Sequence, residues 1–182
     1  MKYSLILLFA LACGPGDQGA DGGTLPPPED LLEGEDFGGV AFADPAGIVL
    51  LGSDSAGSPT LQLLIGDGAA PSCANPAAFD TLLSIVVAKS PGTGIVPGDY
   101  GVLDNANLPN PLPANFALAS ATDCGGLLAL GTGGSVELSA LGEMASGVYE
   151  VLGAGGTRVR GVFDLPVCQS AQTLGGVVGF CR

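Results

Sequence analysis

The sequence predicts an all-β domain, an antiparallel β-sandwich of about ten short strands stapled by disulfides, with a β-barrel as the alternative. Glycine and proline are abundant, with 31 and 14 residues, and charged residues make up only 13% of the chain. Val, Leu and Ile fall in short runs between Gly, Pro, Asn and Asp, which favours strands and turns over helices. The apolar content of 47% argues against general disorder.

The first residues have the pattern of an export signal. Met1-Lys2 is a short positive start, and the apolar stretch up to Ala12 is much shorter than the roughly 20 residues that span a bilayer as a helix. Its end, Ala10-Leu11-Ala12-Cys13, resembles the lipobox of bacterial lipoproteins, where the cysteine becomes the N-terminus and carries acyl chains. Ala10 stands where that family usually has Leu. An ordinary secretory signal that happens to contain Cys13 is the alternative.

The lipobox resemblance implies a location for the protein. Residues 1–12 would be the signal peptide, and lipidation at Cys13 would anchor the mature chain. Gly14, rather than Asp, follows the cysteine, and in this family that implies the outer membrane, at its periplasmic face or the cell surface. Removal of the signal leaves 182 − 12 = 170 residues, enough for one domain with a real core.

Residues 13–36 are rich in Gly, Pro, Asp and Glu, which predicts a flexible acidic tether with a stiffer Pro26-Pro27-Pro28 segment. A flexible chain of this length has a root-mean-square reach on the order of 25 Å. Leu31-Leu32 is expected either to form one helical turn or to pack on the domain. The β-sandwich domain is expected over residues 37–182.

The first half of the domain should hold several strands. Thr60 to Ile65 alternates, with Leu61, Leu63 and Ile65 on one face, so one side of this strand should be buried. Leu82 to Ala88 reads as a buried central strand; a helix over 76–88 is the alternative. Other expected elements are strands at 37–42, 47–51 and 100–103, a helical turn at 76–79 after Asn75, and turns at 44–45, 52–59, 66–68 and 97–99.

The last third has the clearest strand pattern. In 157–167, Val159, Gly161, Phe163, Leu165 and Val167 share one face, and Arg158, Arg160, Val162 and Asp164 share the other. The expected strands of this part are 116–121, 126–130, 136–140, 148–152, 157–167 and 174–180, with a turn at Gly142-Glu143. The last four of these strands should form an antiparallel meander.

Two glycine runs, 131–134 and 153–156, faintly resemble dinucleotide-binding loops. That motif needs a helix after it, and a strand follows 153–156, so we predict that the glycines serve positive φ angles in tight connections.

Cysteine usage predicts a covalent framework. Five cysteines minus the lipid-bearing Cys13 leave Cys73, Cys124, Cys168 and Cys181, an even number that indicates disulfides in an exported chain. Of the three possible connectivities, Cys73–Cys124 with Cys168–Cys181 is favoured, because the second pair would clip one hairpin. A four-thiolate metal site is the alternative, but no Cys-x-x-Cys pair exists.

Composition excludes several function classes. A formal charge of −13 makes the chain a poor partner for nucleic acid and for anionic lipid surfaces, so membrane contact should come from the anchor alone. The chain has no His, and no Gly-x-Ser-x-Gly or calcium-loop motif is present. We therefore expect no cofactor, no metal site and no enzymatic activity.

The longest internal loop, residues 104–115, is the candidate binding site. It carries Asn105, Asn107, Asn110 and Asn115 among three prolines. Long loops on rigid β scaffolds often carry function, although an ordinary connection is the alternative. An envelope protein or a glycan is the expected partner. With no Trp and only Tyr100 and Tyr149 left after the signal, the protein is favoured.

A carboxylate-dependent hydrolase of the cell envelope, of the glycosidase type, is the alternative function. Such an enzyme needs two acidic groups of unlike pKa, and none of the available carboxylates forms a recognisable pair in the sequence. The candidates are Asp99, Asp104, Asp123, Glu137, Glu143, Glu150 and Asp164.

The whole layout is similar to a group of uncharacterised lipoproteins of Gram-negative bacteria. They share a lipobox, an acidic or Gly-rich tether, a β domain, a Gly-x-Phe-Asp strand and two cysteines near the C-terminus. Here these features are Gly161-Val162-Phe163-Asp164, Cys168 and Cys181. The resemblance implies a β-sandwich and transfers no functional residue.

Overall fold

The computed structural model describes residues 26–34, 37–38, 42, 44–54, 57–68, 71–73, 79–90, 93–123 and 126–169. Within these residues the chain forms nine strands and one 3-10 turn. The elements are β1 (Glu33–Gly34), β2 (Pro45–Ser53), β3 (Pro59–Gly68), β4 (Phe79–Lys89), β5 (Gly98–Gly101), β6 (Asn115–Thr122), β7 (Leu127–Leu141), β8 (Met144–Gly153), η1 (Ala154–Gly156) and β9 (Arg158–Gln169).

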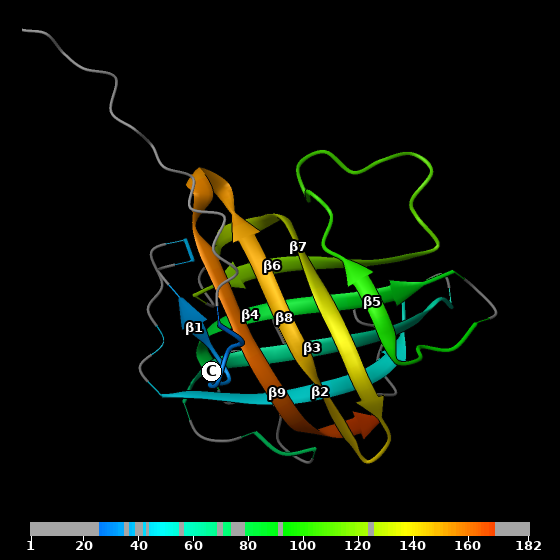
Figure 1. Cartoon of the computed structure of the whole chain (residues 1–182), viewed down its shortest axis with the longest axis horizontal. Helices are drawn as coiled ribbons and strands as arrows, with labels where there is room; N and C mark the ends of the chain where they lie inside the picture. Colours follow the sequence, from blue (N-terminus) through cyan, green and yellow to red (C-terminus); the bar gives the residue numbers. More distant parts are fainter. Residues whose placement is uncertain are drawn as a thin grey trace, which may run out of the picture.

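Seven of these strands close into a barrel. Its order is β2-β3-β4-β6-β7-β8-β9, and β9 pairs with β2 to close it (Figure 1). The closing pair is parallel, whereas the other neighbours in the barrel are antiparallel. β1 pairs with β9 and β5 pairs with β7. The all-β prediction is therefore confirmed, but the sandwich is wrong and the barrel alternative is right.

The barrel closes because two long strands belong to both of its layers. The start of β7 pairs with β6, and the rest pairs with β8. β9 likewise pairs with β8 over Arg158–Pro166 and then with β2 over Val167–Gln169. We call β5, β8, β1 and the adjoining parts of β7 and β9 the front layer, and β2, β3, β4 and β6 the back layer. Figure 1 shows the front strands crossing the back strands.

The glycine run 131–134 explains why the sequence suggested more strands than exist. It lies inside β7, where a register shift falls between Gly131 and Gly133, so two expected strands are one strand of 15 residues. Gly134 has φ +120°, and a Cβ there would lie 2.0 Å from the Glu150 carbonyl oxygen. The glycines let the strand bend without ending. The tight connection expected at 153–156 is confirmed, with φ of 82° at Gly155 and 83° at Gly156.

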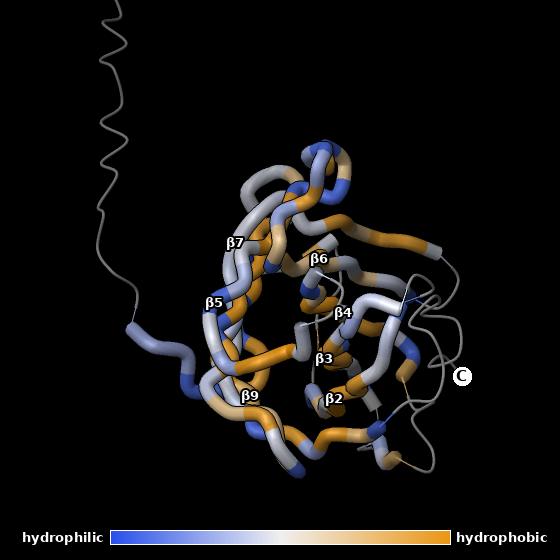
Figure 2. Tube along the Cα trace, turned by 90° about the vertical axis from the view of Figure 1, so that its right-hand side faces the viewer, coloured by the Kyte–Doolittle hydropathy of each residue, from blue (hydrophilic) through white to orange (hydrophobic). Residues whose placement is uncertain are grey.

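The barrel interior is filled by side chains from both layers. Figure 2 shows hydrophobic segments along the strands of both layers. On β9, the predicted inward face is confirmed, because Val159 and Phe163 are buried and Leu165 and Val167 pack against the same cluster. Other members of this main core are Phe37, Val49, Leu61, Leu63, Ile65, Leu83, Ile85, Val87, Tyr100, Ala117, Ala119, Val136, Leu138, Tyr149 and Val151.

A second cluster of buried residues lies on the outer side of the back layer. It consists of Ile48, Leu50, Leu64, Phe79, Leu82 and Cys168. β3 therefore buries both faces: Leu63 contributes to the main core and Leu64 to the second cluster. The predicted strand at 60–65 and its buried face of Leu61, Leu63 and Ile65 are confirmed, but the expectation that only one side is buried is wrong. Polar side chains of this outer face are buried too, since Gln62 is 5% exposed and donates a 2.8 Å hydrogen bond to the Ser84 hydroxyl.

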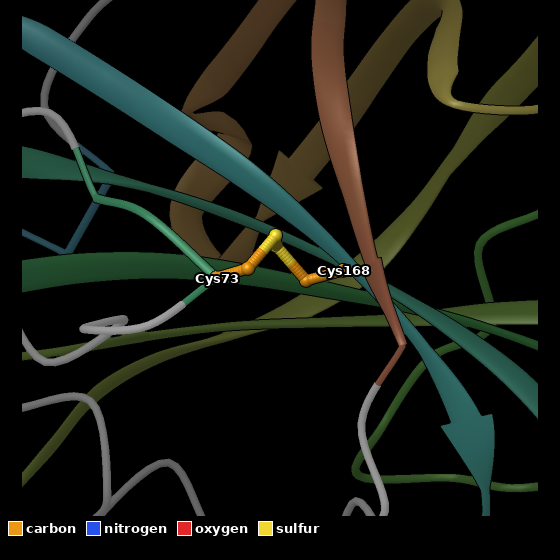
Figure 3. The surroundings of a disulfide bond; sticks show 2 residues. All are labelled: Cys73 and Cys168. Carbon is orange, nitrogen blue, oxygen red and sulfur yellow. A yellow bond between two sulfur atoms is a disulfide. The ribbon is translucent and has the colours of Figure 1, made fainter.

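One disulfide joins Cys73 to Cys168 (Figure 3), so the favoured pairing of each of these cysteines with Cys124 or Cys181 is wrong. The parallel register of β2 and β9 sets Cys168 beside Leu50, on the outer face of the back layer. The predicted Cys168–Cys181 pair assumed a local hairpin. In the structure Cys168 instead lies in a pairing between β9 and β2, which are far apart in sequence. Two predicted disulfide cysteines are thus bonded, and the chain contains a disulfide staple as expected.

Several other expectations are confirmed locally. Residues 79–89 form strand β4, so the helical alternative fails there. The turn at 52–59 is closed by Asp54, whose backbone NH donates to the Ser58 carbonyl at 2.9 Å. The three-strand meander β7-β8-β9 is antiparallel.

Other predictions lie outside the described residues: the signal peptide 1–12, the lipidation site Cys13, the strand 174–180, the helical turn after Asn75, and Cys124 and Cys181. Among the described residues, no helix is long and apolar enough to cross a membrane.

Candidate functional site

The candidate binding loop, predicted at residues 104–115, lies at residues 103–114 in the structure, because Asn115 already belongs to β6. It joins the end of β5, after the bridged Val102, to β6 and stands out from the barrel (Figure 1). Every residue from Ala106 to Ala114 is exposed. The loop begins beside the barrel, because the Leu103 backbone NH donates to the Ala117 carbonyl at 2.9 Å. A projecting segment is thus attached to a rigid β scaffold, as the sequence suggested.

The base of the loop is folded around Asp104. Its carboxylate accepts a 2.9 Å hydrogen bond from the Ala106 backbone NH and a 2.7 Å bond from the Asn107 side-chain amide. This is an Asx-type turn, in which a short acidic side chain replaces a backbone acceptor. The Asn107 amide, and then the Ala106 NH, hold the pKa of the Asp104 carboxyl below its ordinary value. The turn is therefore made with ionised Asp104.

Asn105 fastens the same base to the barrel wall. Its side-chain amide donates to the Ala119 carbonyl of β6 at 2.9 Å, and its backbone NH donates to the Gly131 carbonyl of β7 at 3.0 Å. Its Oδ1 atom is buried without a hydrogen-bond partner. Asn105 thus positions the loop rather than presenting a polar group to a ligand.

The outer part of the loop presents aliphatic side chains. Leu108 and Leu112 are each 47% exposed, among Pro109, Pro111 and Pro113, and the Asn110-Pro111 peptide bond is cis. An exposed pair of leucines on a proline-restricted loop is suited to contact an apolar surface. Sequence reasoning named the asparagines and missed both leucines, although their position in the longest polar loop was a usable signal.

The four asparagines do not form one cluster. Asn105 and Asn107 lie at the base, and Asn110 is exposed farther along the loop. Asn115 is the first residue of β6 and stands opposite Lys89 of β4. Two of the four predicted residues, Asn105 and Asn107, therefore have structural roles, and the binding role of the loop stays a prediction.

The candidate carboxylates are spread over the molecule, with one exception. Asp99 of β5 stands directly opposite Glu137 of β7, and both are exposed. A glycosidase pair places one of its carboxyl groups in an apolar pocket, and neither of these exposed side chains lies in one. Glu150 instead lies 3.8 Å from Arg158, and Asp123 accepts a hydrogen bond from the Gly126 NH. In the part of the chain that the structure describes, no three His, Cys, Asp or Glu residues could hold a metal ion.

The two tyrosines of the domain are buried in the core. Tyr100 and Tyr149 are each 2% exposed. The Tyr100 hydroxyl donates to the Val96 carbonyl at 2.6 Å, and the Tyr149 hydroxyl donates to the Leu31 carbonyl at 2.8 Å. Burial raises the pKa of Tyr149 far above its ordinary value, and the nearby Glu33 charge raises it further. Neither ring face is available to stack on a sugar.

Comparison with known proteins identifies no relative. No family model, no curated protein and no solved structure matches the chain. Function must therefore be inferred from the residues and geometry of this chain.

Proposed function

We propose that this protein is a non-enzymatic binding module of the Gram-negative envelope, held at the outer membrane by a lipid on Cys13. The lipobox-like Ala10-Leu11-Ala12-Cys13 end supports the anchor, and the Cys73–Cys168 disulfide is consistent with export to an oxidising compartment. The acidic charge of −13 makes direct adhesion to anionic lipid unfavourable, so the lipid chains supply the membrane contact.

The projecting loop 103–114 is the observation that carries the binding role. Its base is fixed by Asp104 and Asn105, and its outer part exposes Leu108 and Leu112 at 47% each. A fixed base lowers the ordering cost of binding, and exposed aliphatic side chains supply apolar area. We therefore assign the loop as the contact surface for a protein partner.

A protein is favoured over a glycan by the aromatic side chains. Tyr100 and Tyr149 are both buried, so the described part of the domain offers no exposed tyrosine ring to a sugar. The loop instead offers leucine and proline side chains, which suit an apolar pocket in another protein.

The loop assignment is tested by placing a photo-crosslinking residue at position 108 or 112 of the protein in living cells. We expect the same partner to be captured from both positions, and a Leu108→Asp/Leu112→Asp variant to lower its binding at least tenfold. Burial of the aliphatic side chains in the complex is the reason, because a carboxylate there would be desolvated without a counter-ion.

Leu127 provides a matched control, because it is 62% exposed on β7, outside the loop. A crosslinker at 127 should not capture that partner, and Leu127→Asp should bind normally. Equal capture from 108, 112 and 127, or normal binding by the double loop variant, would contradict the loop assignment.

The anchor is tested separately by Cys13→Ser and cell fractionation. We expect the wild-type chain in the outer-membrane fraction and the variant in a soluble or inner-membrane fraction, since the acyl chains would be lost. Outer-membrane recovery of the variant at the wild-type level would show that Cys13 does not hold the protein there.

A further inference from the structure

Residues 26–34, which we call the strap, lie along the edge of β9 where β2 does not pair with it (Figure 1 shows β1 beside β9). The sequence predicted an acidic tether here, and the structure docks this part of it on the barrel. The contacts are hydrogen bonds from the Val162 NH to the Asp30 carbonyl (2.9 Å), from the Tyr149 hydroxyl to the Leu31 carbonyl (2.8 Å) and from Arg160 to the Pro26 carbonyl (2.6 Å), with Leu31 and Leu32 packed on the main core.

Arg160 is the charged centre of this docking. Its guanidinium lies 3.0 Å from the Glu33 carboxylate, and the two side chains are 18% and 25% exposed. The same Glu33 carboxylate accepts hydrogen bonds from the backbone NH groups of Glu29 and Asp30, which folds the strap around it. One arginine therefore binds the strap at two places, through Glu33 and through Pro26.

Phe37, which follows the strap, is anchored in the barrel. The Phe37 ring is fully buried in the main core, and a Cβ at Gly153 would lie 2.7 Å from it. Gly34, the last residue of the strap, adopts φ +130°, and a Cβ there would lie 2.3 Å from the Arg158 carbonyl oxygen, so only glycine fits this close approach to β9. The buried Phe37 ring would keep the chain attached to the barrel if the strap were released.

The backbone pairing of the strap is short. β1 pairs with β9 over Glu33 and Gly34 only, whereas β2 and β3 pair over nine residues. Segments with few ladder bonds open at lower free energy than core strands, without global unfolding. The strap is therefore suited to local release.

We propose that the strap is a releasable latch that sets the length of the membrane tether. Docked, it leaves the 25 − 13 = 12 residues after Cys13 as tether; released to Phe37, it leaves 36 − 13 = 23. At ~3.4 Å per residue, the greatest span rises from roughly 40 Å to roughly 80 Å. The purpose of the latch rests on the proposed anchor, but its opening does not.

Hydrogen exchange of the full chain in detergent, followed by mass spectrometry, tests the latch. We expect Arg160→Gln to raise the exchange rates of strap amides and of the Val162 amide at least tenfold, because both Arg160 contacts are lost. Peptides from β2 and β3 should keep wild-type protection, which shows that the barrel stays folded.

Arg158→Gln is the matched control, because Arg158 lies on the same strand but pairs with Glu150, 3.8 Å away. This variant makes the same change of charge and should leave strap exchange within twofold of wild type. Gly34→Ala is the second test variant, since it strains the strap without altering charge, and it should also accelerate strap exchange.

Two results would overturn the latch. In one, Arg160→Gln and Gly34→Ala leave strap exchange at the wild-type rate. In the other, the strap amides exchange only as fast as those of β2 and β3, so that the strap opens only with the whole barrel. Neither result depends on acylation of Cys13, which the fractionation of Cys13→Ser tests.

Discussion

The outer faces of the two layers are built on opposite principles. The front layer carries charge and faces solvent, with Glu137, Arg158 and Asp164 exposed. The back layer buries its outer face, where Ile48 and Leu64 are fully buried and the polar Gln62 is 5% exposed. The back layer is thus packed on both faces, and we infer that it is the more stable half of the barrel.

Removal of the Cys73–Cys168 disulfide should have the largest effect on the stability of the back layer. The two cysteines are 95 residues apart in sequence, and the bond joins Cys73 to Cys168 on the outer face of the back layer. On the loop-entropy model a loop of this length stabilises by up to about 4.7 kcal/mol, so Cys73→Ala/Cys168→Ala should lower the free energy of unfolding by several kcal/mol. Urea denaturation measures the loss.

The same denaturation under reducing conditions is the control for the disulfide. Reductant should destabilise the wild type more than the double alanine variant, which lacks this disulfide but keeps Cys124 and Cys181. A double variant as stable as the oxidised wild type would mean that the bond does not hold the back layer.

Leu64→Ala compares the two faces of one strand. Leu64 is 0% exposed on the outer face of β3, and Leu63 is 1% exposed on the inner face. Each truncation should cost about 2–5 kcal/mol of unfolding free energy, because each leaves a cavity in a packed cluster. Val148→Ala, on the outer face of the front layer, should cost less than about 1 kcal/mol. If Leu64→Ala behaved like Val148→Ala, the second cluster would not be a core.

These two faces also mark where sequence reasoning succeeded. On β9 the alternation is readable, because Arg158 and Asp164 face water while Val159 and Phe163 face the core. On β3, Leu64 continues the apolar pattern onto the outer face, so period-two alternation could not reveal which sides are buried. The local pattern predicts that a strand forms. Whether the second face of that strand is buried depends on which other parts of the chain pack against it.

Pairings between distant segments were beyond local reasoning for a related reason. β9 meets β2 in parallel, which brings Cys168 to Leu50 and hence to Cys73, whereas sequence proximity suggested a hairpin partner. Barrel closure depends on this same pairing. At the candidate site, the loop was predictable from its prolines, and the Asp104 carboxylate bonds within the loop. The anchoring role of Asn105 could not be predicted, because its partners lie on β6 and β7.

Ser84→Ala tests the buried polar pair of the back layer. Its hydroxyl accepts the 2.8 Å hydrogen bond from the Gln62 side chain, and both residues are buried. Losing the acceptor leaves a buried amide donor unsatisfied, at a cost of about 1–3 kcal/mol. Ser135→Ala on the exposed front face should change the unfolding free energy by no more than about 0.5 kcal/mol. Thermal and urea unfolding measure the loss of stability in both variants. Equal losses for Ser84→Ala and Ser135→Ala would contradict the claim that the outer face of the back layer is buried and that of the front layer is not.

Acid should loosen the front layer locally, and this is the smallest expected effect. Hydrogen bonds from the Glu29 and Asp30 NH groups, helped by Arg160, lower the pKa of Glu33. A lowered pKa stabilises the docked strap above the ordinary carboxyl pKa, and this contribution is lost as the pH falls through the lowered value. The charged or titratable groups around the Glu33 carboxylate are Arg160 and Arg158 on β9, Glu150 and Tyr149 on β8, and Glu29 and Asp30 on the strap.

The acid effect is measured by strap exchange, corrected for the intrinsic pH dependence of amide exchange. Glu33→Gln should remove most of the pH dependence. A pH response that persists in Glu33→Gln would point to another carboxylate.

The most direct test of the whole account is the mass of the protein isolated from cells, with a non-reduced peptide map after thiol alkylation. We predict a chain that begins at Cys13 and carries diacylglyceryl and N-acyl groups, with a cross-linked peptide pair containing Cys73 and Cys168. A full-length chain with unmodified Cys13 and alkylated, free thiols at Cys73 and Cys168 would contradict both the exported, anchored state and the clipped back layer.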